Sequence, residues 1–201
     1  MQRCVAQFGS NHLYKSNLGV NLVIYYTADQ HFGHSNIIRF CDRPFENVAE
    51  MDETLINNWN NVVSDGDIVY ILGDLVFRSE KSASHYIDRL KGIKHLILGN
   101  HDHKWIKNCN LQKHFASVSY YLEIKDGERR IALCHYPMLS WGGAARGALY
   151  IHAHIHNKKD GLTFEALRQM DNALNAGVEI NNYRPVTLEE LILNTRKFKD
   201  S

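Results

Sequence analysis

The sequence is poor in the features that define several special classes of protein. It has only 3 Pro and 13 Gly in 201 residues, which excludes collagen-like and low-complexity chains. The net charge at pH 7 is +1, so the chain has no broad positive field for an extended nucleic acid or an anionic membrane. No apolar run approaches the roughly 18 residues of a membrane span. A small nucleotide bound locally is compatible with this charge balance.

Cysteine is also scarce, with 4 residues at positions 4, 41, 109 and 134. No two of them form a Cys-x-x-Cys pair, which predicts free thiols in a reducing compartment. The first residues lack the continuous apolar core of a signal peptide. We therefore expect a cytoplasmic, soluble protein with a poorly ordered or peripheral extension over residues 1–20 and a single domain over residues 21–201.

Apolar strands alternate with amphipathic helices in the first half, which predicts an α/β fold, and the second half is richer in strands. Helix starts are indicated by the capping pairs Asn47/Glu50 and Thr187/Glu190 and by Ser79. Further helical turns are expected near Trp105 and within a polar stretch at 157–173. The expected strands cover residues 22–26, 68–72, 95–98 and 149–151, with a hairpin over 117–134 that turns at 126–127.

Each predicted strand leads directly into a cluster of polar residues. The clusters are Asp29-Gln30-His31, Gly73-Asp74, Gly99-Asn100-His101-Asp102, His135, and His154-Ile155-His156. Ligands of open α/β sheets bind outside the carboxyl ends of the strands, so we expect these five clusters to converge on one crevice.

The spacing within two of these clusters suits a shared ligand. In extended backbone, residues i and i+2 point the same way, so Asp29 and His31 can face one site, as can His154 and His156. Either pair alone is weak support, because such pairs also occur on ordinary surfaces. All five clusters in this order, each at a strand end, form a far more specific signal.

The donor set is made of carboxylates, a carboxamide and imidazoles, with no thiolate. This set suits Mn, Fe or Zn rather than an iron–sulfur cluster. Seven candidate ligands are too many for one tetrahedral ion, and they suit two ions that share a carboxylate.

The five blocks resemble the signature of the calcineurin-like metallophosphoesterases, over residues 29–156 and in the same order. The sequence is most similar to small single-domain bacterial and phage members, which carry His-Phe-Gly-His and Arg-Pro-Phe after the first block. In this chain these are residues 31–34 and 43–45. One departure is Ala153, which stands where the family has Gly before the last His pair.

The resemblance implies a four-layer α-β-β-α sandwich of α/β (α+β) class. It assigns one metal to Asp29, His31 and His156, a second to Asn100, His135 and His154, and Asp74 to both. It also makes His101 the substrate-facing proton donor or charge stabiliser. We expect Asp102 to orient the His101 imidazole.

Other residues are candidates for holding the substrate phosphate. His34 lies three residues beyond His31, and the guanidinium forks of Arg43 and Arg146 suit phosphate oxygens.

The expected function is hydrolysis of a small phosphoester, such as a nucleotide, with two divalent transition-metal ions (Mn, Fe, Zn or Ni). A metal-bridging hydroxide would attack phosphorus, with phosphodiesters the first choice and phosphomonoesters the second. The alternative is a catalytically silent metal-binding or scaffold member of the same fold. A nuclease that tracks DNA is disfavoured by the balanced charge. The sequence does not indicate the oligomeric state.

Overall fold

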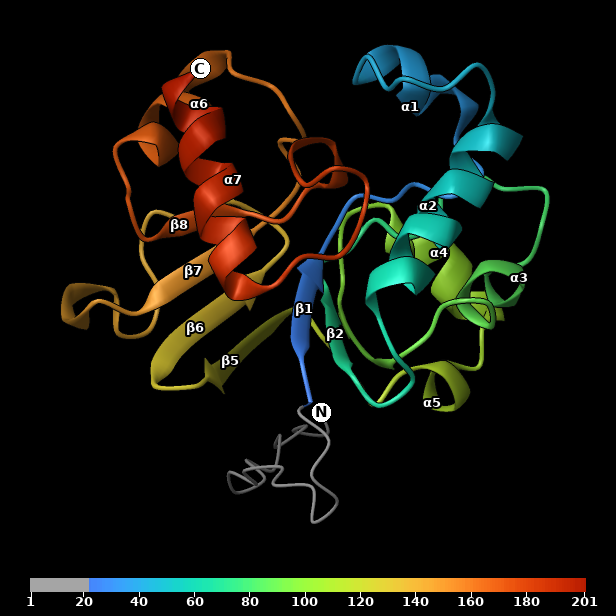
Figure 1. The fold of residues 1–201 in the computed structure, drawn as a ribbon, viewed down its shortest axis with the longest axis horizontal. Coiled ribbons are helices and arrows are strands. Elements are labelled where there is room, and N and C mark those ends of the chain that lie inside the picture. Colours follow the sequence, from blue (N-terminus) through green and yellow to red (C-terminus); the bar gives the residue numbers. More distant parts are fainter. Residues whose placement is uncertain (1–21) are drawn as a thin grey trace, which may run out of the picture.

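The protein, represented by a computed structural model, is described over residues 22–201, and its core is a pair of four-stranded sheets (Figure 1). The extension expected over residues 1–20 lies outside the described residues. Within them, no helix combines the length and hydropathy needed to cross a membrane.

The first sheet is wholly parallel, in the order β1-β2-β3-β4. Its strands are β1 (Ile24–Thr27), β2 (Ile68–Ile71), β3 (Ile93–Ile97) and β4 (Ser117–Ser119). The connections carry α1 (Ser35–Phe40), α2 (Val48–Val62), α3 (Ala83–Ile87), α4 (Asp102–Trp105), η1 (Ile106–Asn108) and α5 (Leu111–His114). In Figure 1, α2 to α5 lie together on the side of β1 and β2 that faces away from the second sheet.

The second sheet has the order β5-β6-β7-β8, with one antiparallel hairpin and two parallel pairs. Its strands are β5 (Tyr121–Asp126), β6 (Arg129–Cys134), β7 (Leu149–His152) and β8 (Ala173–Asn175). The remaining elements are η2 (Ala144–Arg146), α6 (Gly161–Arg168), η3 (Val178–Ile180) and α7 (Leu188–Asp200).

Side chains alternate along the strands and so divide the apolar residues between separate cores. In β2, Ile68 and Tyr70 pack in the core between the sheets, whereas Val69 and Ile71 pack in the core beneath the helices. Strands β6 and β7 alternate in the same way between the inter-sheet core and the outer face of the second sheet. The two sheets therefore pack face to face.

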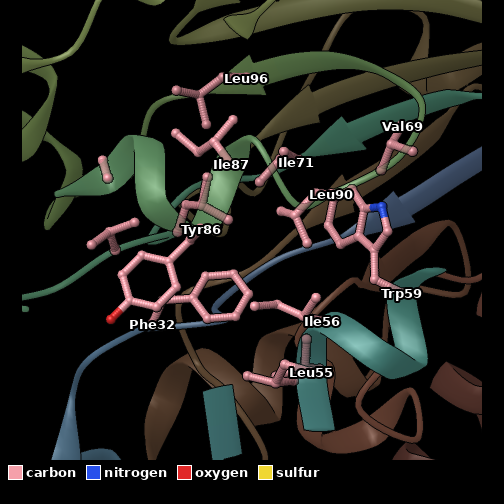
Figure 2. Packing of buried hydrophobic residues seen from close by; sticks show 14 of the residues in the cluster. Phe32, Leu55, Ile56, Trp59, Val69, Ile71, Tyr86, Ile87, Leu90 and Leu96 are labelled. Carbon is pink, nitrogen blue, oxygen red and sulfur yellow. The ribbon is translucent and has the colours of Figure 1, made fainter. Parts of the chain in front are cut away.

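The core beneath the helices is rich in aromatic residues (Figure 2). Phe32 stacks on Tyr86 with ring centroids 4.9 Å apart. Trp59 of α2 is buried, and its indole Nε1 donates to the carbonyl of Lys91 at 3.0 Å. These contacts hold the helices against the first sheet.

The outer face of the second sheet is covered by α6 and by the loop after β6. Tyr150 of β7 stacks on Trp141 of that loop at 5.0 Å, and Leu167 of α6 packs in the same cluster. Helix α7 contacts β1 and β8, which are edge strands of the two sheets. The architecture is the expected four-layer α-β-β-α sandwich.

Three local expectations need correction. The third helix is capped by Ser82, because the Ser79 hydroxyl is already bonded to the Tyr86 hydroxyl at 2.7 Å. The apolar stretch 117–125 is not one hairpin strand, since β4 pairs with β3 and β5 pairs with β6 in the other sheet. Strand β8 was not predicted at all, because three residues are too few to show a period.

Candidate metal centre

The loops that follow the strands are joined by backbone hydrogen bonds at one end of the sandwich. The Asp29 N–H donates to the carbonyl of Gly73 at 3.0 Å, and the His31 N–H donates to that of Asp74 at 3.0 Å. The second sheet joins them through the His154 N–H, which donates to Asp29 Oδ2 at 3.1 Å. The polar clusters expected to meet are therefore brought together.

The backbone at this end is strained. Nine described residues other than glycine have positive φ, and five of them are predicted ligands: Asp29, His31, Asp74, His154 and His156. A residue with a side chain costs about 1–3 kcal/mol in such a conformation, and such residues concentrate at functional sites. The strain is an indication of function that does not depend on the sequence motif.

Two glycines allow the loops to approach closely. A Cβ at Gly99 would lie 2.3 Å from Asp74 Oδ1, and one at Gly73 would lie 2.5 Å from the Gly99 nitrogen. Gly73 also has φ +86°, which side chains rarely adopt. Both glycines of the predicted motifs are thus needed for the site to close.

The first group of candidate ligands is Asp29, His31 and His156, whose donor atoms lie within 4.8 Å of one another. Asp29 Oδ1 and both ring nitrogens of His31 are buried without a hydrogen-bond partner. Buried polar atoms are nearly always partnered, and a cation would give a partner to Asp29 Oδ1 and to one of the two His31 ring nitrogens. The donor set fits a transition-metal ion.

The second group is Asn100, His135 and His154. The His135 Nδ1 lies 2.7 Å from the carbonyl of Leu72, which can only accept, so the proton sits on Nδ1 and leaves Nε2 with a lone pair. That lone pair faces Asn100 Oδ1 at 3.0 Å, and His154 Nδ1 lies 2.9 Å from the same oxygen. With the Asn100 amide in this orientation, His135 Nε2 and Asn100 Oδ1 are both acceptors and neither can donate to the other. A cation bound by both atoms would resolve this mismatch.

Asp74 lies between the two groups. Its Oδ2 is 3.6 Å from Nε2 of His31 and 3.6 Å from Nε2 of His135. Its Oδ1 accepts from the His101 N–H at 2.8 Å. One carboxylate therefore reaches a member of each group.

Two further histidines lie at the edge of the cluster. The side chain of His101 is 36% exposed, and its Nε2 lies 3.9 Å from Asp74 Oδ2. The ring of His34 lies 5.4 Å from that of His31, and burial, followed by the charges of His101 and Arg43, lowers its pKa to about 4. Both rings are placed where a substrate bound to the cluster could reach them.

The structure corrects the role expected for Asp102. Its carboxylate accepts from the backbone N–H groups of Asp74, Leu75 and Gly99 at 2.8–3.0 Å and from the Trp105 indole at 2.7 Å. No described hydrogen bond of Asp102 reaches the His101 imidazole. Asp102 is fully buried, and it positions the loops after β2 and β3.

Arg43 was expected to hold substrate phosphate, and its position excludes that role. The residue is buried, and its guanidinium donates to the carbonyls of Asp29 and Gln30 at 2.6 and 2.8 Å. It also forms an ion pair with Glu179 at 2.6 Å. Arg43 therefore supports the strained loop around Asp29 from behind.

Glu179 is the site residue that sequence reasoning missed. Its Oε1 lies 2.9 Å from Nδ1 of His156 and so keeps a proton on that nitrogen, which makes Nε2 the nitrogen that would bind a metal ion. Glu179 follows β8, the strand that was not predicted. Polar residues that follow a predicted strand are site candidates. Glu179 would have been among them if β8 had been predicted.

Arg146 lies exposed in η2. Among the described residues, none forms a hydrogen bond or ion pair with its side chain. Its role in substrate binding stays a prediction.

Ala153, which replaces the family glycine, causes no strain. Its φ is not positive, it is fully buried in the inter-sheet core, and its N–H donates to the His135 carbonyl at 2.9 Å. The positive φ falls on the next residue, His154.

Electrostatics at the cluster favour cations. Burial raises the pKa of Asp29 to about 6 and that of Asp74 to about 7. Burial would lower the pKa of His156, but Asp29 and Glu179 raise it to about 11. Burial also opposes the charge of Glu179, whose pKa Arg43 and His156 nevertheless lower to about 2. Without cations the cluster retains protons that metal ions would displace, so metal affinity should rise with pH.

The chain has clear relatives, although no family model matches it. It is 38% identical over 179 residues to the uncharacterized protein MJ1445 of Methanocaldococcus jannaschii, covering 88% of this chain and 93% of the relative. It is 30% identical over 160 residues to the Gene 66 protein of Mycobacterium phage L5, covering 66% of this chain and 77% of the relative.

Among solved structures, the protein of unknown function AQ665 from Aquifex aeolicus aligns with a TM-score of 0.67 at 27% identity. The alignment covers 85% of this chain and 97% of that one. The E. coli phosphoesterase YfcE aligns at 15% identity over 77% of each chain, with a TM-score of 0.34 that is too low to carry an inference.

The four-layer sandwich, with five motif blocks gathered at one end of its two sheets, defines the class of protein. The chain belongs to the same family as MJ1445, and its motif blocks resemble the signature of the calcineurin-like metallophosphoesterases.

Proposed function

We propose that the protein is a dinuclear-metal-dependent phosphoesterase. The observation that carries the proposal is the position of Asp74, whose Oδ2 lies 3.6 Å from His31 and 3.6 Å from His135. These histidines belong to different ligand groups, so the simplest interpretation is that two ions share the Asp74 carboxylate.

The residues that would hold the ions are those of the two groups, and their donors fit Mn, Fe, Zn or Ni. Asp29, His31 and His156 would hold one ion, Asn100, His135 and His154 the other, and Asp74 both. When bound, two such ions supply an activated water and neutralise charge on a phosphoryl group.

The chain's own residues would complete the reaction. His101 is partly exposed and held beside Asp74 through its backbone N–H, so its Nε2 can deliver a proton to a leaving alkoxide. His34 is close enough to the cluster to contact a phosphate oxygen. We take phosphodiesters as the first substrate class and phosphomonoesters as the second. The free thiols of Cys41, Cys109 and Cys134 favour a cytoplasmic setting for this activity.

A metal-by-substrate screen tests the proposal. Chelated protein is reloaded with Mn, Zn, Ni, Mg or Fe and assayed on aryl phosphodiesters and monoesters, cyclic nucleotides and dinucleotides. We expect hydrolysis with at least one metal, and its loss on chelation. His154→Ala should lose most of this activity, whereas His85→Ala, an exposed histidine on α3, should keep it. Hydrolysis of no ester with any metal, or activity that survives chelation, would overturn the proposal.

A further inference from the structure

A groove runs away from the metal cluster between the loop after β6 and helix α6. Its first section has a volume of about 360 Å³ and is lined by Tyr136, Pro137, His154, His156, Thr163 and Phe164, among others. Two of these residues are candidate metal ligands. The groove therefore borders the cluster, and a molecule bound at the ions could extend into it.

The groove becomes apolar with distance from the cluster. A second section of about 250 Å³ shares Pro137 and Thr163 with the first. Its other walls are wholly apolar and comprise Met138, Leu139, Leu162, Ala166 and Leu167. Met138 is unbranched and flexible, so it can adapt to occupants of different shape.

Two side chains in this section are unusually exposed. Leu139 is 76% exposed and Leu162 is 89% exposed, the highest values among the large apolar side chains of residues 22–201. Apolar surface gains about 25 cal/mol per Å² when it leaves water, and exposed apolar patches often mark ligand grooves. Both leucines line the same section, so one occupant would cover them together.

The polar residues of the groove do not favour a charged occupant. Lys158 and Asp160 both line the first section, and their charges offset each other. Tyr136 presents a half-exposed ring at 5.1 Å from that of His135 and 5.0 Å from that of His154. An apolar substituent that extends from the cluster into the groove would contact the Tyr136 ring first and the leucines of the second section next.

We propose that this groove binds the organic group of the substrate, which is therefore a phosphoester with a bulky, uncharged, apolar substituent. The proposal rests on the proposed function, because the phosphoryl end is assigned to the metal cluster. The groove would thus favour phosphoesters with an apolar organic group over esters whose organic group is small or multiply charged.

Phosphonates test the groove without hydrolysis, because each carries one organic group and its C–P bond is not an ester. Binding of phenylphosphonate and methylphosphonate to the Mn-loaded protein is measured by calorimetry. We expect the phenyl compound to bind about tenfold tighter or more, as for other apolar pockets. In the double variant Leu139→Ser, Leu162→Ser the preference should fall to within about threefold, while methylphosphonate binding stays unchanged. The control Leu193→Ser, also an exposed leucine but on α7, should keep the wild-type preference.

The outcomes separate the two proposals. Phenyl selectivity that needs the two leucines, without hydrolysis of any ester, would support the groove and contradict the proposed activity. Hydrolysis with equal binding of the two phosphonates, or selectivity unchanged in the double variant, would overturn the groove alone. A dimer in solution that dissociates in the double variant would also overturn it, because a second copy would then be the occupant.

Discussion

The two sheets contribute different chemistry to the same site. Among the candidate ligands, the first sheet supplies both carboxylates and the carboxamide, together with His31, whereas the second sheet supplies only histidines. Each ligand group draws on both sheets, since His156 joins Asp29 and His31, and Asn100 joins His135 and His154. Neither sheet alone supplies a complete ligand group. Metal binding should therefore stabilise the packing of one sheet on the other.

The largest effect is expected at Asp74, the carboxylate that we propose is shared by both ions. Asp74→Asn removes one negative charge from the centre of the cluster, where it would attract both ions. We expect activity to fall by at least about 10³-fold, since several kcal/mol of charge stabilisation is lost. Metal content, measured by elemental analysis, should fall with it.

Asp65→Asn is the matched control, because Asp65 is exposed in the loop before β2, at the opposite end of that strand. Equal activity of the two variants would contradict the role given to Asp74.

A variant of His101, which follows β3 of the first sheet, tests proton transfer separately from metal binding. His101 is not a candidate ligand, so His101→Ala should retain two ions per chain. Its loss should slow hydrolysis of an alkyl ester by about 10²–10⁴-fold, and that of a nitrophenyl ester less, because that leaving group needs no proton. The exposed neighbour His103 provides the control variant His103→Ala. Loss of metal, or full activity on the alkyl ester, would show that His101 has another role.

The ion pair of Arg43 and Glu179 joins the loops of the first sheet to those of the second, behind the candidate ligands. Variants of these two residues test whether both sheets are needed for metal binding. Glu179→Gln should weaken metal affinity by about 10–100-fold, as for other groups that orient a ligating histidine. Arg43→Met should lower the free energy of unfolding by about 3–5 kcal/mol, since the buried Glu179 carboxylate loses its guanidinium partner and keeps only His156. Combining the two substitutions should recover part of that loss in chemical denaturation.

Arg43→Lys distinguishes this account from phosphate binding. If Arg43 only supports the loop, the lysine should weaken metal binding and leave KM at saturating metal unchanged. A raised KM with normal stability would instead restore the phosphate role.

The smallest effect is expected at Ala153, which follows β7 of the second sheet. Its backbone is unstrained, so Ala153→Gly should lower the free energy of unfolding by only about 0.5–1 kcal/mol. Metal stoichiometry should not change. A variant more stable than the natural chain in thermal unfolding would show that alanine is strained there after all.

The same comparison explains what could be predicted from the sequence. The first sheet is built from regular strand–helix repeats, so Asn47 and the apolar spacing behind it predicted α2 closely. The strand ends there carry motif residues, and they meet as expected. In the second sheet, β8 is three residues long and has no period, and the change of sheet between β4 and β5 leaves no mark in the sequence.

Individual roles depended on burial, which the sequence does not display. A lone arginine such as Arg43 can be exposed or buried, and only the fold shows that Glu179 partners it. Likewise Asp102 follows His101 in sequence, yet its carboxylate turns toward backbone N–H groups. The meeting of the strand-end residues was predictable, whereas the roles of Asp102 within one motif and of Arg43 and Glu179 outside them were not.

The most direct test is anomalous diffraction from crystals of the Mn-loaded protein. The account predicts two anomalous peaks per chain, both in contact with Asp74, and each with ligands from both sheets. A single peak, a peak held by residues of one sheet only, or a peak bound to the thiol of Cys41 beside His156 and Glu179 would contradict it.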